Sequence, residues 1–196
     1  MKKLAFALAL SAALSATLSG CVSLGKKPPP SLLTLTPAAT APAGLSATGK
    51  PIDALTVIDP DAPQKLDVTR VPVQVDGSTV AYLKDAVWVE KPARLFARLV
   101  AETIRAKQTR MVIEGSDVRF AAATKLSGQL VEMGYDARTS TALVRFDAVL
   151  QQPDGQVMTR RFEASVPGVL ANPQAVGTAL NQAANKVAAD VASWIG

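Results

Sequence analysis

The spacing of apolar residues changes along this chain, and that spacing sets the strongest limit on its fold. Between residues 92 and 107, Leu95, Leu99 and other apolar residues recur every three or four positions, which is the period of an α-helix. The same spacing returns from Val176 to Ile195. Several other stretches alternate apolar and polar residues, which is the period of a β-strand. The sequence therefore predicts strands, a helix, further strands and a last helix.

Turn residues divide the alternating stretches into separate strands. Asp59-Pro60, Asp76-Gly77 and the segment 152–155 are typical of tight turns. A change of phase near Thr69-Arg70 predicts a bulge. Strands are expected over residues 54–58, 66–75, 79–83, 125–133, 142–151 and 156–166, with a shorter one at 111–113.

Helix start signals complete the pattern. Pro92 suits the first turn of a helix, and Asn172 can cap a helix whose first residue is Pro173. This order of elements predicts an α+β fold, a two-layer sandwich in which two amphipathic helices pack on a mostly antiparallel sheet. Packing on the sheet is the simplest role of the helix at 92–107, and binding to a partner or a membrane is the alternative.

The N-terminus has the features of a secretory signal. Two lysines precede an uncharged apolar stretch over residues 4–17, which is shorter than the roughly 20 residues that span a membrane. The residues Leu18, Ser19, Gly20 and Cys21 then resemble a bacterial lipobox, in which small residues admit the peptidase and the thiol takes the lipid. Cys21 is the only cysteine of the chain. An ordinary secretory signal followed by a chance cysteine is the alternative.

The lipobox divides the chain into three parts. Residues 1–20 are the expected signal peptide, residues 21–50 the lipidated Cys21 with a Pro- and Ala-rich tether, and residues 51–196 the periplasmic domain. Val22 follows the cysteine, and under the enterobacterial sorting rule it implies anchorage in the outer membrane. Residues 31–35 could instead be a strand of the domain, which would shorten the free tether to 22–30, at most about 30 Å long.

The composition offers little catalytic chemistry. With no histidine and one cysteine, the chain cannot form an internal disulfide, a usual zinc site or a His-based catalytic site. The carboxylates of Glu90, Glu102, Glu132 and Asp136 are scattered, without the spacing of an acid–base pair. We therefore expect no catalytic residue, no metal and no cofactor. Nucleic acid is not an expected partner either, because no basic run and no nucleic-acid motif is present.

An aromatic stretch directly before the first helix holds the expected partner-binding residues, Tyr82, Trp88 and Glu90. It contains one of the two tyrosines and one of the two tryptophans of the chain. An aromatic pair on a loop can form part of a contact surface. Alternatively, Trp88 fills the junction between the sheet and the helix.

Taken together, these segments resemble the ABC-type transport auxiliary lipoproteins, a family that includes paraquat-inducible protein C and YmbA-like proteins. The residues that carry the resemblance, besides the lipobox and the tether, are Val71, Pro72, Val73, Tyr82, Trp88, Glu90, Pro92, Leu95, Phe96, Leu99 and Ile104. The resemblance covers about residues 32–194. One departure is the opening strand, where relatives carry an aromatic Tyr-x-Leu pattern and this chain has Ser31-Leu32-Leu33-Thr34-Leu35.

The resemblance implies a noncatalytic periplasmic subunit that works with an ABC ATPase, a permease and a mammalian-cell-entry (MCE) domain protein. Such a system moves phospholipid or other hydrophobic compounds between the inner and outer membranes. The tethered domain would dock the MCE assembly at the outer membrane, and it could do so as a ring-shaped homo-oligomer. The alternative function is an envelope-assembly lipoprotein, for example one that regulates a peptidoglycan synthase, since it would have the same anchor and a similar domain.

Overall fold

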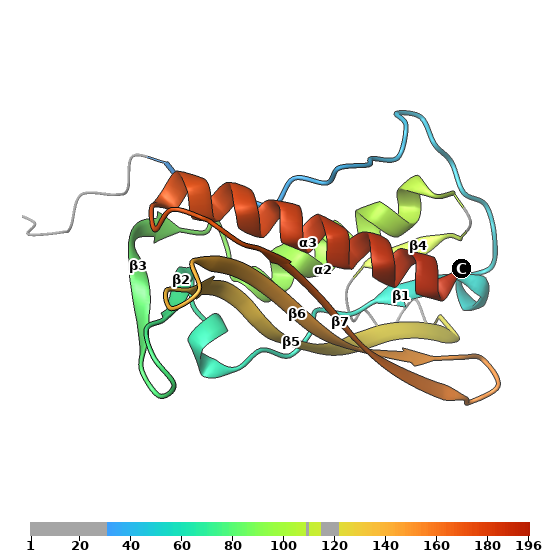
Figure 1. Cartoon of the computed structure of the whole chain (residues 1–196). Coiled ribbons are helices and arrows are strands. Elements are labelled where there is room, and N and C mark those ends of the chain that lie inside the picture. The colour runs from blue at the N-terminus through green and yellow to red at the C-terminus, as the bar shows by residue number, and fades with distance from the viewer. Residues whose placement is uncertain (1–30, 109, 115–121) are drawn as a thin grey trace, which may run out of the picture.

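A curled sheet and two helices form the part of the chain that the computed structural model describes, residues 31–108, 110–114 and 122–196 (Figure 1). The seven strands of this part are β1 (Leu55–Val57), β2 (Arg70–Gln74), β3 (Val80–Val87), β4 (Val112–Glu114), β5 (Thr124–Asp136), β6 (Thr141–Gln151) and β7 (Val157–Val166). The helices are α2 (Pro92–Ala106) and α3 (Pro173–Ile195), and the short 3-10 helices are η2 (Pro51–Asp53) and η3 (Gln64–Leu66). The predicted strands and helices are all present, with bounds shifted by a few residues.

The long strand β5 lies at the centre of the sheet and uses both of its edges. One edge pairs with β6 in antiparallel register from Lys125 to Asp136. The other edge is divided: its first residues pair with β1, its last two with β2. Between them, Asp61 fills the gap by donating its N–H to the carbonyl of Gly128 and accepting the N–H of Leu130. Every other strand is therefore placed, directly or through one neighbour, by β5.

The α+β class is confirmed, but the mostly antiparallel sheet and the two-layer sandwich are not. The sheet is mixed, because β1 runs parallel to β4 and β5, and β2 runs parallel to β5. It also curls like a half-barrel around the helices (Figure 1). The reason for the parallel pairs is the position of α2, which lies between β1–β2 and β4–β5 in the chain. A helix that crosses over the sheet returns the next strand in the same direction.

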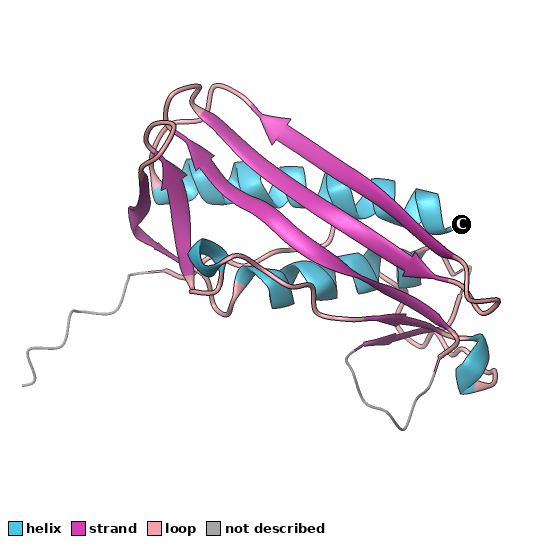
Figure 2. Cartoon of the chain, turned by 90° about the horizontal axis from the view of Figure 1, so that it is seen from below, coloured by secondary structure: helices cyan, strands magenta, loops and turns pink. Residues whose placement is uncertain are grey.

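Both helices cover the same face of the sheet, and Figure 2 shows them side by side behind the strands. On α2 the predicted apolar stripe is buried, and Phe96 packs against Phe146 of β6 with 5.1 Å between ring centroids. On α3 the buried face is mostly Ala and Val, and Trp194 near its end packs on Phe162 of β7. The Asn172 side chain accepts the N–H of Ala175, as expected of a helix cap. The helix at 92–107 thus packs on the sheet.

The ladder between β2 and β3 contains a bulge next to Arg70, and its extra residues belong to β3. Arg70 pairs with Val87 and Pro72 pairs with Tyr82, so four residues of β3 face one residue of β2. Asp85, within the extra segment, has a positive φ of 59°. The bulge expected near Thr69-Arg70 is therefore present in the ladder between β2 and β3, with its extra residues in β3. Leu66 lies in η3, so β2 itself begins only at Arg70.

A glycine sets the closest approach between β2 and β5. A Cβ atom on Gly134 would lie 2.6 Å from the carbonyl oxygen of Pro72 and 3.0 Å from its ring. Because that oxygen is backbone, Gly134→Ala has to push the two strands apart. We expect a loss of about 1–3 kcal/mol in the free energy of unfolding, as for other overpacked sites. Urea unfolding followed by circular dichroism measures it.

The matched control is Gly77→Ala in the turn between β2 and β3. No atom lies within 4 Å of the position of its Cβ. We expect a change within about 0.5 kcal/mol, the range of ordinary surface substitutions. Equal destabilisation by the two alanines would show that the contact with Pro72 is not what constrains residue 134.

Candidate functional site

The first described residues cross over both helices, and we call residues 31–41 the N-terminal strap. At its start, Leu33 donates its N–H to the carbonyl of Val87 at 2.8 Å, and its carbonyl accepts the N–H of Val89 at 2.9 Å. This is one parallel bridge opposite Trp88, not a full strand. The sequence left open whether residues 31–35 join the domain, and the structure joins them to the end of β3.

Side chains of both helices then hold the backbone of the strap. Asn181 accepts the N–H of Thr36 at 2.8 Å. Asn185 accepts the N–H of Ala38 at 2.7 Å and donates to the carbonyl of Thr36 at 2.9 Å. Two side-chain amides one helical turn apart thus make the hydrogen bonds to the strap backbone that a neighbouring strand would otherwise make.

Further along the strap, a carboxylate of α2 continues the same role. Glu102 accepts the N–H of Ala41 at 2.8 Å. That hydrogen bond is the main cause of the lowered pKa of Glu102, and its ion pair with Arg105 lowers it further. A charged acceptor makes a stronger hydrogen bond than a neutral one. Both helices are therefore connected to the entry segment of the domain.

Apolar contacts add to these polar ones. Leu35 of the strap is buried in the core, and Leu33 packs over Gly177 of α3. A Cβ on Gly177 would lie 2.6 Å from a methyl carbon of Leu33. The strap is thus packed as part of the domain, and residues 22–30 are the segment of sequence between Cys21 and the described chain.

The expected partner-binding residues occupy different surroundings. Trp88 is 1% exposed and lies in the core, and its indole N–H has no acceptor in the described part of the chain. Tyr82 is half-buried on β3 under the guanidinium of Arg70, which lies 4.1 Å from its ring centroid. Glu90 is half-buried and pairs with Arg98 of α2. Trp88 thus fills the junction between sheet and helix, whereas a partner contact of Tyr82 and Glu90 stays a prediction.

The face of the sheet opposite the helices, which we call the open face, carries ion pairs. Alternate residues of β6 point into the core and out to this face. On the open face Asp147 binds Arg161 of β7 through two hydrogen bonds of 2.6 Å. Its neighbour Arg145 binds Glu163 directly across the same two strands. The charges of this face are thus balanced in cross-strand pairs.

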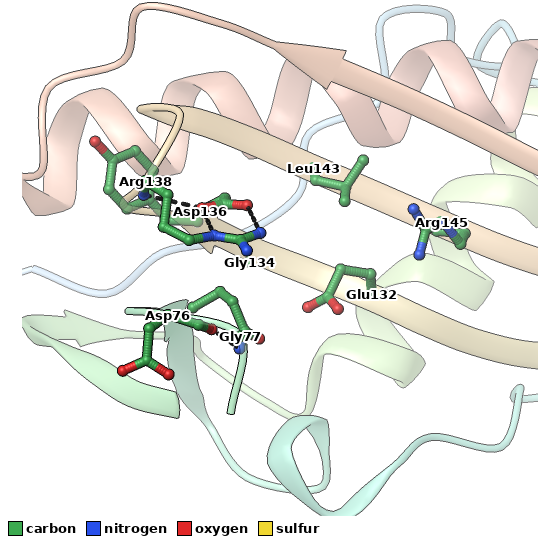
Figure 3. A pocket seen from close by; sticks show the side chains of 10 residues that line it. Asp76, Gly77, Glu132, Gly134, Asp136, Arg138, Leu143 and Arg145 are labelled. Carbon is green, nitrogen blue, oxygen red and sulfur yellow. Dashed lines mark hydrogen bonds and ion pairs between the residues drawn. The ribbon is translucent and has the colours of Figure 1, made fainter. Parts of the chain in front are cut away.

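At one end of the open face lies a pocket of about 340 Å³ (Figure 3). Its polar lining consists of Gln74, Asp76, Glu132, Asp136, Arg138 and Arg145. Figure 3 shows Arg138 folded back onto Asp136, to which it donates two hydrogen bonds of 2.6 and 3.0 Å. Asp76 accepts the backbone N–H groups of Ser78 and Thr79. Glu132 pairs with Lys65 of η3 at 2.6 Å. Each carboxylate of the pocket already has its partner.

The hydrogen bonds to Asp76, Asp136 and Asp147 favour the charged form of these three carboxyl groups. The hydrogen bond from the Arg138 side chain lowers the pKa of Asp136 to about 2. The backbone N–H of Ser78 lowers the pKa of Asp76, and the side chain of Arg161 lowers the pKa of Asp147. A general acid needs the opposite shift, so that it keeps its proton near neutral pH. The arrangement suits polar contacts better than proton transfer.

The lipid-attachment site and the absence of a metal site were also expected from the sequence. The lipobox residues Leu18, Ser19, Gly20 and Cys21 lie outside the described residues. Within residues 31–108, 110–114 and 122–196, no group of three or more Cys, His, Asp or Glu residues is arranged to hold a metal ion. Across the same ranges, no helix has the length and apolar character needed to cross a membrane.

Sequence reasoning missed the residues that hold the strap. Asn181 and Asn185 stand four residues apart in a helix that is otherwise rich in Ala and Val. Amide side chains on one face at this spacing were the available signal, because residues i and i+4 of a helix are neighbours. Glu102 is one of several scattered carboxylates, and nothing in the sequence distinguishes it from the others.

Comparison with known families and structures adds three findings. Residues 33–192 match the family model described as ABC-type transport auxiliary lipoprotein component. The fold is similar to that of a DUF330-family protein from Xanthomonas campestris, with a TM-score of 0.65 and 19% identity over 84% of this chain and 94% of that chain. A second solved structure, of an uncharacterised protein, has a TM-score of 0.63 and 11% identity over 85% and 100% of the two chains. At these identities the two structures show the fold alone, and curated protein sequences gave no match.

The strap offers a direct test through Asn185. Asn185→Ala removes both hydrogen bonds between this side chain and the strap. We expect the free energy of opening the strap to fall by about 1–2 kcal/mol, because each such bond contributes about 0.5–1.5 kcal/mol. Amide hydrogen exchange at Ala38 measures the change. The control is Lys186→Ala, which removes an exposed pair with Asp190 on the same helix and should leave exchange at Ala38 unchanged.

The other end of the strap is predicted to depend on pH. Because the folded-state pKa of Glu102 is lowered from 4.5, its contribution is fully present above that value and is lost as the pH falls through the lowered pKa. We expect the amide proton shift of Ala41 to titrate with a midpoint below 4.5. NMR spectroscopy follows it, and Glu102→Gln should abolish the titration. A midpoint above the ordinary value would contradict the assigned hydrogen bond.

Proposed function

Since the chain belongs to the family of ABC-type transport auxiliary lipoprotein components, we propose that it is the outer-membrane-anchored, noncatalytic subunit of an MCE-type lipid transporter. In this role the lipid on Cys21 holds the protein in the outer membrane and the domain faces the periplasm. The domain meets the MCE protein, which receives hydrophobic substrate through an ABC permease and ATPase in the inner membrane. The cargo is phospholipid or another hydrophobic compound.

The observation that supports this role most is the extent of the family match. It begins at residue 33 in the strap and ends at residue 192 in α3. The strap and the domain are thus matched as one unit. A docking subunit has to transmit its position at the membrane to its folded surface. The hydrogen bonds of Asn181, Asn185 and Glu102 to the strap provide that connection.

The noncatalytic character rests on the chemistry of the open face. Asp147 pairs with Arg161 and Glu132 with Lys65, while Asp76 accepts the backbone N–H groups of Ser78 and Thr79. Hydrogen bonds hold the pKa values of Asp76, Asp136 and Asp147 below the ordinary value of an aspartate. A surface of paired charges is suited to selecting a protein partner, since complementary charge gives specificity more than affinity.

Purification of the tagged wild-type lipoprotein from native membranes tests the role. We expect the MCE protein, the permease and the ATPase to be recovered with it. Recovery of a peptidoglycan synthase or a secretion pore instead, together with an unchanged lipid distribution in a deletion strain, would favour the envelope-assembly function.

The anchor is tested in the same preparation by Cys21→Ala, which removes the acceptor of the lipid. We expect loss of palmitate labelling and loss of the cleaved form from the membrane fraction, because acyl chains supply its membrane affinity. Ser23→Ala, two residues away, is the control and should keep the label and the membrane fraction. Palmitate labelling of the alanine variant at the wild-type level would refute the assignment of Cys21.

A further inference from the structure

Three large apolar side chains lie exposed at the end of the domain where the strap begins. They are Leu32, Val89 and Leu170, which are 51%, 49% and 73% exposed, and we call them the end patch. Most large apolar side chains of the described residues are buried in the core. A group of them that is exposed together at one end therefore needs an explanation.

The backbone shows why these side chains share one surface. Leu33 lies opposite Trp88, and both side chains turn toward the core. In neighbouring strands successive side chains alternate between faces, so Leu32 and Val89 turn outward. Leu32 lines the same groove as Asn172 and Pro173 at the start of α3. Leu170 stands just before that start, where its carbonyl accepts the N–H of Asn172 at 2.8 Å.

The chain enters the domain at this same end. Figure 1 shows the start of the strap beside the N-terminal end of α3, and the C-terminus at the opposite end of that helix. Residues 22–30 connect Cys21 to Ser31, and nine residues can reach about 30 Å at most. The sequence Pro28-Pro29-Pro30 directly before Ser31 favours a semi-rigid spacer. A lipid on Cys21 therefore keeps the end patch within reach of the bilayer.

Charges beside the patch are neutralised within the domain. Glu90, next to Val89, pairs with Arg98 and lies near Arg94. Lys91 pairs with Asp67 at 2.7 Å. A surface whose ions are paired meets a smaller desolvation cost when it approaches lipid headgroups than one with single charges.

We propose that the end patch rests on the lipid surface that holds the anchor, so that α3 points away from the membrane. The inference rests on the lipid anchor of the proposed function. With 23 residues at 1.5 Å each, α3 would carry its C-terminal end roughly 35 Å farther from the bilayer. The end with η2 and the turn between β6 and β7 would then face the periplasm.

A bilayer is favoured over a protein as the occupant because of the tether. A short linker gives the patch an effective concentration at the membrane that no freely diffusing partner shares. Apolar side chains at the rim of a membrane-bound protein bind the interface through their buried area. The end of the domain at Ser31 has both features, a short tether to the anchor and exposed apolar side chains.

The test uses the full lipoprotein reconstituted in vesicles of phosphatidylethanolamine and phosphatidylglycerol. The chain has no cysteine other than Cys21, whose sulfur carries the lipid, so a new cysteine can be labelled alone with a fluorescent maleimide. The label is placed at Leu170→Cys and, as the matched position, at Ile52→Cys in η2, which is also exposed but lies at the end of the domain that holds the C-terminus. Lipids with a nitroxide on the acyl chain serve as the quencher.

We expect the label at residue 170 to lose most of its fluorescence and the label at residue 52 to lose none. Equal quenching at both positions, or none at residue 170 in protein that floats with the vesicles, overturns the proposal while the anchor stands. Protein that does not float refutes the anchor and the proposal with it.

A second pair of variants separates apolar contact from mere proximity. Leu32→Glu with Val89→Glu should abolish quenching of the label at residue 170, whereas Leu45→Glu with Ile52→Glu should leave it unchanged. All four positions are exposed, so neither pair perturbs the core, and circular dichroism checks this. Quenching that survives the first pair overturns the patch as the contact.

Discussion

The architecture depends on the backbone pairing of β5. This strand of 13 residues pairs with β6 along one edge and with three separate segments along the other. Its register with β6 shifts between Leu130 and Glu132, and a bulge of this kind bends a strand. Two glycines permit the close approaches that result. Gly128 has φ +145°, and a Cβ there would lie 2.0 Å from the carbonyl oxygen of Asp147. Gly134 admits Pro72 on the opposite edge. The curl that follows gives the sheet a concave face, and the two helices fill it.

Because the helices fill that face, the strap can reach them both. Its backbone groups would be unsatisfied if it lay on apolar side chains, so polar residues are needed on the outer faces of α2 and α3. Glu102 and the pair Asn181 and Asn185 supply them. Tension on the tether would therefore act first on the bridge at Leu33 and then on both helices. The entry segment of the domain is thus coupled to both helices and not to one loop.

Local patterns predicted the elements well, because period and turn residues are properties of short segments. The parallel pairing of β1 and β2 was not predicted, because the sequence of a strand does not show which strand lies beside it. The direction of these strands follows from the crossover through α2, which is a property of the whole fold. Trp88 illustrates the same limit at one residue. An aromatic residue before a helix is compatible with a surface or a plug, and its burial at 1% exposure depends on the strap and sheet around it. The hydrogen bonds of the strap to α3 could not be predicted, because Asn181 lies 145 residues from Thr36 in the sequence.

The proposed contact of the end patch with the bilayer also determines how the open face of the sheet is oriented relative to the membrane. Strands β6 and β7 run along the length of α3 in both views (Figures 1 and 2). If α3 stands away from the bilayer, the open face stands with it, and its pairs Asp147–Arg161 and Arg145–Glu163 lie along the side of the domain. Lipid contact is then confined to the apolar end, and the charged side is left to proteins. Because exposed ion pairs are weak and screened by salt, a partner can exchange them for its own at little cost, which would suit the proposed docking role.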